Sequence, residues 1–156
     1  MTKPRDHNRA VSRPHLAVER GVTMGNRAGE AVELRLDATL AQLPLVRTMA
    51  AAVAMRQDYD IDSIADLRLV VDEACGLLLA RALPFSTLVV QFDPTPTEVR
   101  VRCSVSVLNE TPLARSGLGW RLISTLVDTV STAVFDGEVF AELVIDLCMA
   151  RRAAVA

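Results

Sequence analysis

Residues 64–82 read IADLRLVVDEACGLLLARA, and the rest of the chain is arranged around this stretch. Its apolar residues recur at steps of three and four, which is the spacing of a helix with one buried face. The residues on that face are Ile64, Leu67, Val71, Ala74 and Leu78. Ser63 is in position to cap the helix, and Leu83-Pro84 to stop it. We therefore predict a central amphipathic helix here.

An acidic pair, Asp72-Glu73, lies in the middle of this helix beside the apolar face. Carboxylates at such a position can simply form a solvated side of the helix. They can also serve as functional groups, because a site beside a core holds its side chains in place. The spacing alone leaves both interpretations open.

Composition limits the domain organisation. The chain has 156 residues, of which 51% are hydrophobic and 23% charged, so we expect one domain, over residues 31–150. It contains no run of about 18 apolar residues and no apolar segment typical of a secretory signal, which predicts a cytoplasmic protein without a membrane span. Cys75, Cys103 and Cys148 lie far apart in apolar patterns. We expect reduced core thiols rather than disulfides or a metal site.

The two ends of the chain differ from the rest. Residues 1–30 carry six Lys or Arg against three acidic residues and lack an apolar period, which predicts a disordered basic tail. The remainder is acidic and the tail has no interleaved aromatic residues, so we favour a solvated tail over a nucleic-acid arm. His7 and His15 lie within it and are poor candidates for catalysis or metal binding. Residues 151–156 are expected to form a frayed C-terminal tail.

Before the central helix, the sequence predicts a strand and a first helix. Residues 32–36 alternate apolar and polar, and Asp37 can cap a helix that runs to about Gln57. Pro44 costs a hydrogen bond inside a helix, so the helix proper should begin near it.

After the central helix, alternating patterns predict four strands and one more helix. The ranges are strands 88–92 and 99–107, a helix over 122–130, and strands 131–135 and 139–147. Each helix is apolar on one side only, which favours an α+β two-layer sandwich with the helices on one face of a largely antiparallel sheet.

The loop before the last helix contains two glycines, in the sequence Ser116-Gly117-Leu118-Gly119. Backbone amides exposed at a helix N-terminus suit a phosphate group. Two glycines are also typical of a tight loop that lets a helix pack closely. Both interpretations stay open at this point.

Two motifs together resemble a known family. DEAC, at residues 72–75, is followed about 40 residues later by SGLGWRLISTLVD, at residues 116–128. The pair resembles the anti-sigma factor and serine-protein kinase family of the GHKL (Bergerat-fold) ATPases, and most closely the anti-sigma-F branch. The resemblance covers about residues 32–148. It implies a histidine-kinase-ATPase-like fold with a largely antiparallel, mixed sheet.

The resemblance assigns roles to individual residues. Glu73 matches the family's catalytic carboxylate, and Ser116, Gly117 and Gly119 match the second glycine box, which wraps nucleotide phosphates. The family's magnesium-binding Asn should follow one turn after the carboxylate, at the position of Leu77. A leucine cannot coordinate a hard cation that requires oxygen ligands.

The first glycine box of the family, D-x-G-x-G, is missing. Residues 107–110 read VLNE and contain neither its Asp nor a Gly, and only about ten residues are left for the ATP lid. Because the adenine acceptor and the metal ligand are both lost, we expect weak or no ATP affinity, no required ATP, Mg or other metal cofactor, and a vestigial Glu73.

Partner binding need not be lost with the pocket. In the family, an Arg on the first helix contacts both the sigma factor and the competing anti-anti-sigma protein, and Arg47 matches it. The alternative is that Arg47 is an ordinary exposed helix residue. Family members also commonly form homodimers through sheet and first-helix surfaces.

Three hypotheses follow. In the first, the protein is an anti-sigma factor that sequesters an alternative sigma factor of RNA polymerase and is relieved by a STAS-type antagonist. The second is an active ATP-dependent serine kinase for that antagonist, with Asp72 or Asn109 as a replacement metal ligand. The third is a scaffold that only dimerises.

Overall fold

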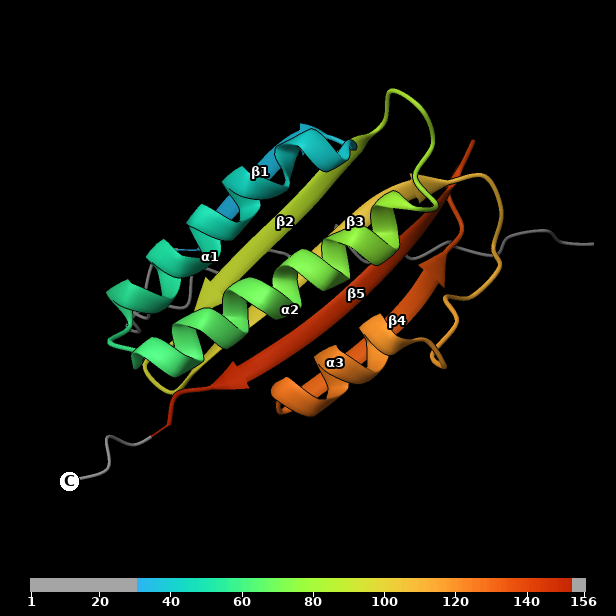
Figure 1. Cartoon of the computed structure of the whole chain (residues 1–156). Helices are drawn as coiled ribbons and strands as arrows, with labels where there is room; N and C mark the ends of the chain where they lie inside the picture. Colours follow the sequence, from blue (N-terminus) through green and yellow to red (C-terminus); the bar gives the residue numbers. More distant parts are fainter. Residues whose placement is uncertain (1–30, 153–156) are drawn as a thin grey trace, which may run out of the picture.

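A computed structural model describes residues 31–152, and in it three helices pack on one face of a five-stranded sheet (Figure 1). The helices are α1 (Leu43–Arg56), α2 (Ile61–Leu79) and α3 (Leu118–Leu126), with a 3-10 turn η1 (Leu40–Gln42) before α1. The strands are β1 (Val32–Asp37), β2 (Thr87–Pro94), β3 (Glu98–Val107), β4 (Thr129–Phe135) and β5 (Ala141–Ala150). The predicted N-terminal tail with His7 and His15, and residues 153–156, lie outside the described residues.

The sheet has the order β1-β2-β3-β5-β4, and each neighbouring pair is antiparallel. The predicted α+β two-layer sandwich is confirmed. No parallel pair occurs among the described strands, although a mixed sheet was expected. The reason is the position of β5, because β3 and β4 run in the same direction but β5 lies between them and opposes both.

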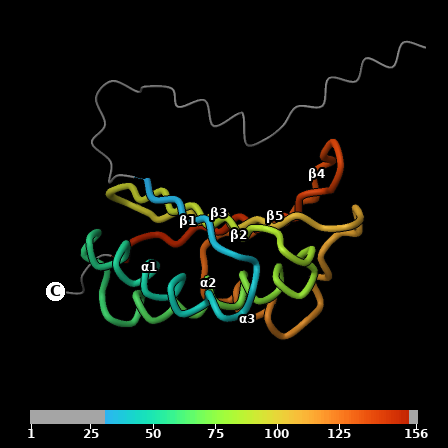
Figure 2. Tube along the Cα trace, turned by 90° about the horizontal axis from the view of Figure 1, so that it is seen from above, coloured from blue at the N-terminus to red at the C-terminus, as the bar shows by residue number. Residues whose placement is uncertain are grey.

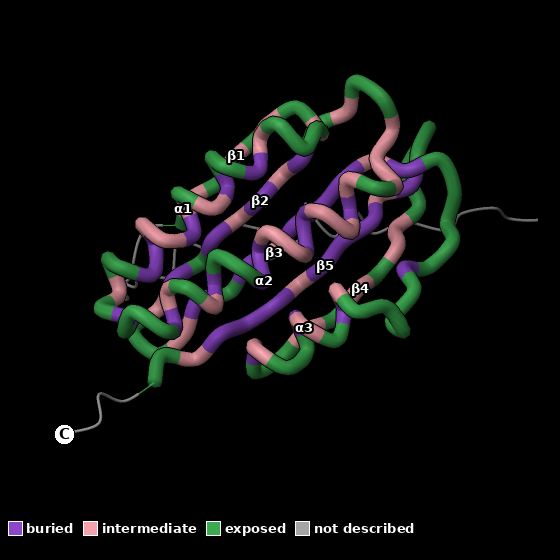
Figure 3. The backbone as a smooth tube through the Cα atoms, viewed as in Figure 1, coloured by how far each residue is buried: buried purple, intermediate pink, exposed green. Residues whose placement is uncertain are grey.

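The core lies between the single layer of helices and the sheet (Figures 2 and 3). The helix α2 crosses the middle of the sheet, and Leu67, Val71 and Leu78 on its inner side are fully buried. They belong to one buried cluster with alternate residues of the central strands, including Phe92 and Ile145, which are also fully buried. The apolar face predicted for residues 64–82 therefore forms the centre of the core. No helix in residues 31–152 is long and apolar enough to cross a bilayer.

The start of α2 differs from the prediction. Its cap is Asp60, whose side-chain oxygen accepts a hydrogen bond from the backbone N–H of Ser63 at 2.7 Å. Asp60 has extended backbone angles and places a negative charge at the positive end of the helix, so it caps better than a serine inside the first turn. The prediction of Ser63 as the cap was therefore wrong.

The start of α1 was predicted in part. Asp37 is the last residue of β1, so it does not cap the helix. The chain first forms η1, and α1 then begins at Leu43 with Pro44 in its first turn, as the proline predicted.

The connection from α1 to α2 is fixed by Tyr59. Asp58 has a positive φ of 56°, and the backbone N–H of Tyr59 donates to the carbonyl of Ala54, which closes the C-terminus of α1. The buried hydroxyl of Tyr59 donates to the carbonyl of Met149 on β5 at 2.7 Å. This hydrogen bond attaches the α1–α2 corner to the sheet.

Alkaline pH should destabilise the domain through two buried groups. Burial raises the pKa of Tyr59 from 10.0 to about 12, and burial together with the nearby Glu98 carboxylate raises the pKa of Cys148 from 9.0 to about 11. Each group holds its proton more tightly in the folded state, so its contribution is complete below the unfolded pKa and is lost as pH rises through the folded pKa. Between pH 9 and 12 we expect the free energy of unfolding to fall by about 1–2 kcal/mol, after allowance for solvent screening.

Urea denaturation at a series of pH values measures this loss. In a Tyr59→Phe variant the decline above pH 10 should be smaller, and in Cys148→Ser the decline between pH 9 and 10 should be smaller. If the free energy of unfolding falls with pH in both variants as it does in wild type, Tyr59 and Cys148 are not the groups responsible.

Two glycines should respond in opposite directions to replacement by alanine. A Cβ on Gly76, in α2, would meet nothing within 4 Å, so Gly76→Ala causes no clash. Because alanine has a higher helix propensity than glycine, this change should stabilise the domain by about 0.5–1 kcal/mol. A Cβ on Gly137 would collide with the backbone oxygen of Phe140, so Gly137→Ala must move the β4–β5 turn and should destabilise the domain. Thermal unfolding of the two variants tests this, and a lower melting temperature for Gly76→Ala would contradict it.

The three cysteines are free and buried, as predicted. The Sγ atoms of Cys75 on α2 and Cys103 on β3 are 3.9 Å apart inside the core. Cys148 lies on the other side of β5 and its thiol donates to Glu98 Oε2 at 3.0 Å. Within residues 31–152, no group of three His, Cys, Asp or Glu side chains could hold a metal ion.

Candidate functional site

The acidic pair of α2 points in two directions. Successive residues of a helix are about 100° apart around its axis, so neighbouring side chains leave on different sides. Asp72 faces α1 and contacts Arg47, whereas Glu73 faces α3 and lies against Gly119. Each carboxylate therefore belongs to a seam between two helices, which neither interpretation of the sequence anticipated.

The first seam contains an ion pair. Arg47 Nε on α1 lies 3.0 Å from Asp72 Oδ1, and both atoms are inaccessible to solvent. The two atoms do not have the geometry of a hydrogen bond, and neither has another hydrogen-bond partner among residues 31–152. The Arg47 side chain as a whole is nevertheless 42% exposed. Since Nε is buried, the exposed part of the side chain consists of other atoms.

Exposed apolar residues lie near Arg47 in the sequence. Leu45, on the first turn of α1, is 56% exposed, and Leu40, in η1, is 67% exposed. Arginine is enriched at the centre of protein interfaces, so a partly exposed Arg47 is compatible with a partner site. The structure thus places the predicted partner-binding residue at the α1–α2 seam, with part of its side chain exposed.

The second seam joins Glu73 and Gly119, two residues that the resemblance assigns to nucleotide binding. A Cβ on Gly119, in the first turn of α3, would lie 3.0 Å from Glu73 Oε2 and 3.6 Å from Leu77 Cδ2. The start of α3 therefore rests directly on Glu73 and Leu77. The lack of a side chain at Gly119 permits this approach, which is the close-packing role that its sequence context left open.

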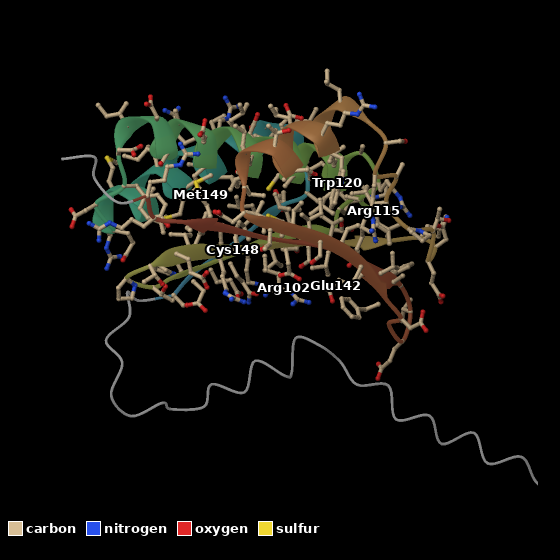
Figure 4. All side chains as sticks on the ribbon, turned by 90° about the horizontal axis from the view of Figure 1, so that it is seen from below. Arg102, Arg115, Trp120, Glu142, Cys148 and Met149 are labelled. Atoms are coloured by element: carbon tan, nitrogen blue, oxygen red, sulfur yellow. The ribbon has the colours of Figure 1, made fainter. Side chains whose placement is uncertain are left out.

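Packing of α3 against the core holds this seam closed. Trp120 and Ile123 are the buried residues of α3, and Figure 4 shows Trp120 on the helix side of the sheet. Leu113 in the preceding loop is also buried. These three side chains attach α3 and its loop to the core by apolar contacts.

Ser116 and Gly117 lie at the solvent-exposed end of the same element. Gly117 is the cap residue of α3, with extended backbone angles and no side-chain hydrogen bond to the helix. The structure thus places Ser116, Gly117 and Gly119 in one turn, as predicted, but with Glu73 and Leu77 already packed against it. Leu77 offers no oxygen ligand to Mg²⁺, and Gly119 lies directly against Glu73.

The proposed replacement metal ligands are engaged elsewhere. Asp72 faces Arg47, in the other seam. Asn109 lies in the loop of residues 108–117 after β3, and its Oδ1 accepts from Arg81 beyond the end of α2 at 3.3 Å and from the backbone N–H of Thr111 at 3.1 Å. Arg81 follows Glu73 by about two helical turns. Neither side chain stands beside Glu73 to complete a metal site.

A groove of about 720 Å³ lies on the opposite face of the sheet, away from the helices. The β4–β5 hairpin rises from the sheet on that side (Figure 2). Figure 4 shows Arg102 of β3 and Glu142 of β5 projecting from the same face. The guanidinium of Arg102 lies 5.9 Å from the ring centre of Phe135 and 3.6 Å from Asp146. Neither this groove nor the smaller cavity beside it borders Glu73.

A strained turn forms one rim of this groove. Leu83-Pro84-Phe85-Ser86 closes with a hydrogen bond from the Ser86 N–H to the Leu83 carbonyl, and Phe85 has a φ of 62° where a glycine is usual. Phe85 is also fully exposed. Three of the four phenylalanines of the chain, Phe85, Phe135 and Phe140, line the groove. Sequence reasoning assigned this turn only as a helix stop, although a Pro-Phe pair at a turn was a visible signal.

Comparison with known proteins agrees with this geometry. The family model of the histidine kinase-like ATPase domain matches residues 36–139. The anti-sigma-F factors RsbW of two Mycobacterium tuberculosis strains, CDC 1551 / Oshkosh and ATCC 25618 / H37Rv, are each 40% identical over 111 residues. The match covers 70% of this chain and 66% of each relative, just under two thirds of their length. These findings confirm the resemblance predicted from the two motifs, and the chain belongs to the histidine kinase-like ATPase domain family.

Proposed function

We propose that this protein is an anti-sigma factor that sequesters an alternative sigma factor and so represses transcription initiation. The observation that carries the proposal is the 40% identity to proteins named anti-sigma-F factors. It implies a cytoplasmic protein, because the sigma factor must be intercepted before it reaches RNA polymerase. A direct nucleic-acid contact is not part of the proposal, since the chain carries a net charge of −2.

The proposed binding surface is the outer side of the helix layer around Arg47. A guanidinium fork recognises a carboxylate through two parallel hydrogen bonds. The exposed Leu40 in η1 and Leu45 in the first turn of α1 add apolar surface to the same part of the helix layer. The complementary partner surface is an acidic residue flanked by apolar side chains. A sigma factor and a STAS-type antagonist that both present such a surface would exclude each other, so the antagonist releases the sigma factor by competition.

The proposal needs no cofactor. Leu77 stands where the family has its magnesium ligand, and α3 packs on Glu73 without an intervening space. Glu73 is then a vestigial catalytic carboxylate, and Ser116, Gly117 and Gly119 retain a helix start rather than a phosphate site. The kinase alternative is not favoured, because Asp72 and Asn109 are held by Arg47 and Arg81.

Homodimerisation through the outer face of the sheet is a second part of the proposal. That face carries the groove with its exposed Phe85 and half-exposed Phe140, and both Arg102 and Glu142 project from it. A twofold contact pairs one surface with itself, so a face that carries apolar, cationic and anionic groups together is suited to it. Analytical ultracentrifugation of wild type and Phe85→Ser tests this, and equal dimer fractions would count against the groove.

A binding panel tests the function. The purified chain is titrated with each sigma factor encoded by its own genome, in Mg-ATP and in EDTA, and then challenged with each STAS-domain protein. We expect one sigma factor to bind with the same affinity, within about twofold, in both buffers, and one STAS protein to displace it. Failure of every sigma factor to bind would contradict the proposal, and radiolabelled phosphate transfer that Glu73→Ala abolishes would establish the kinase instead.

A further inference from the structure

We propose that Asp72 is a positioning residue for the partner site, which holds the Arg47 side chain so that its guanidinium fork faces outward. This inference rests on the proposed function of Arg47 and adds to it a residue that nothing in the family motif or in the relatives assigns. It depends on three features of the α1–α2 seam. They are the distance between Arg47 and Asp72, the difference in exposure between their side chains, and the spacing of side chains around α2.

The distance fixes one end of the guanidinium. Arg47 Nε is 3.0 Å from Asp72 Oδ1, and neither atom is accessible to solvent. A long side chain on a helix surface normally samples many rotamers, and an interface must order it on binding. Attraction to Asp72 supplies that order in the free protein. The cost of ordering is therefore already met when a partner arrives.

The exposure determines which atoms are left for the partner. The Arg47 side chain is 42% exposed although its Nε is buried, whereas Asp72 is only 28% exposed. In the proposed arrangement Asp72 keeps the Nε edge of the guanidinium, and an incoming carboxylate binds the Nη atoms. Two carboxylates can share one guanidinium in this way, because its five donors point in several directions.

The spacing of side chains around α2 explains why Asp72 can contact Arg47 without contacting the α2–α3 seam. Its neighbour Glu73 leaves the helix about 100° away and lies against Gly119. The two carboxylates therefore act in different seams. A change at Asp72 alters the Arg47 side while the α2–α3 contact is kept.

A double-mutant cycle tests the positioning role. The probe is the sigma factor that binds wild type in the panel above, and the variants are Asp72→Asn, Arg47→Ala and the pair. We expect Asp72→Asn to weaken binding about 5- to 10-fold in the wild-type background and not at all in Arg47→Ala, because its effect acts only through the guanidinium. Asp66→Asn makes the same change elsewhere on α2 and should leave the affinity unchanged.

Three results would overturn the inference. An equal loss in both backgrounds would mean that Asp72 touches the partner itself. Tighter binding by Asp72→Asn would mean that it competes with the partner for Arg47. Unchanged affinity with reduced stability to urea would mean a structural ion pair only.

A second measurement needs no partner and separates this inference from the proposed function. In the free protein, hydrogen exchange of the Arg47 Nε–H, followed by NMR, should be slow because the atom is buried, and Asp72→Asn should accelerate it about tenfold. An exchange rate unchanged by Asp72→Asn would overturn the positioning role, whatever binds. If exchange accelerates but Arg47→Ala leaves sigma affinity intact, then Asp72 positions Arg47 and the proposed partner site is wrong.

Discussion

Replacement of Arg47 by glutamate is expected to lower the affinity for the sigma factor by at least about 100-fold, because it removes the guanidinium fork and reverses its charge. The same change should weaken the STAS-type antagonist, since both partners are proposed to use this residue. Fluorescence anisotropy or calorimetry with the purified partners measures both affinities.

The control for this variant is Arg56→Glu, which makes the same change on an exposed arginine of the same helix. Binding by Arg56→Glu should stay within a few-fold of wild type. Arg47→Glu also places a second carboxylate against Asp72, and we expect this to lower stability by no more than about 1 kcal/mol because the pair is partly exposed. Wild-type affinity in a folded Arg47→Glu variant would remove Arg47 from the interface.

Trp120→Ala is expected to have the largest effect on stability, with a loss of about 3–5 kcal/mol in the free energy of unfolding. Trp120 is 8% exposed and, with Ile123, supplies the buried surface of α3. Removal of the indole takes away part of this buried surface, so it should release α3 from Glu73.

Urea denaturation followed by circular dichroism measures this loss, since the variant removes the only tryptophan of the chain. Leu118→Ala serves as the control, because Leu118 lies on the same helix but is 84% exposed and should cost little. Addition of Mg-ATP should not restore stability to Trp120→Ala. A stability near that of wild type would mean that α3 is held by something other than its core contacts.

The two-layer fold could be predicted because its helices and strands are strongly patterned. The apolar face of residues 64–82 and the alternation in residues 99–107 each predict an element with one buried side. One layer of helices on a sheet buries both of these sides. The helix starts were less predictable, since Asp60 and Ser63 are both good caps and backbone angles decide between them. The absence of parallel pairs depends on where β5 inserts, which no local pattern encodes.

The candidate site could be predicted as a set of residues but not as a geometry. The motifs identified Glu73, Gly117 and Gly119, and the leucine at position 77 indicated a lost metal ligand. The ion pair of Arg47 with Asp72 joins residues 25 positions apart in sequence, through a helix packing angle that spacing cannot give. For the same reason, the seams that Asp72 and Glu73 enter became visible only in the folded chain.

The groove on the outer face of the sheet was missed for a different reason. The outward residues of β2, β3 and β5 read as an ordinary solvated face, and only the curl of the β4–β5 hairpin turns that face into a groove (Figure 2). The exposed, strained Phe85 depends on a positive φ, which the sequence does not reveal when the residue is not glycine.

The most direct test of the account is the dissociation constant of the purified chain with its sigma factor, measured by calorimetry in Mg-ATP and again in EDTA. Sequestration through the Arg47 surface with a closed nucleotide site predicts the same constant, within about twofold, in both buffers, and its loss in Arg47→Glu. An affinity that rises or falls more than about tenfold with Mg-ATP would contradict the closed site and would mean that nucleotide binding controls sigma binding.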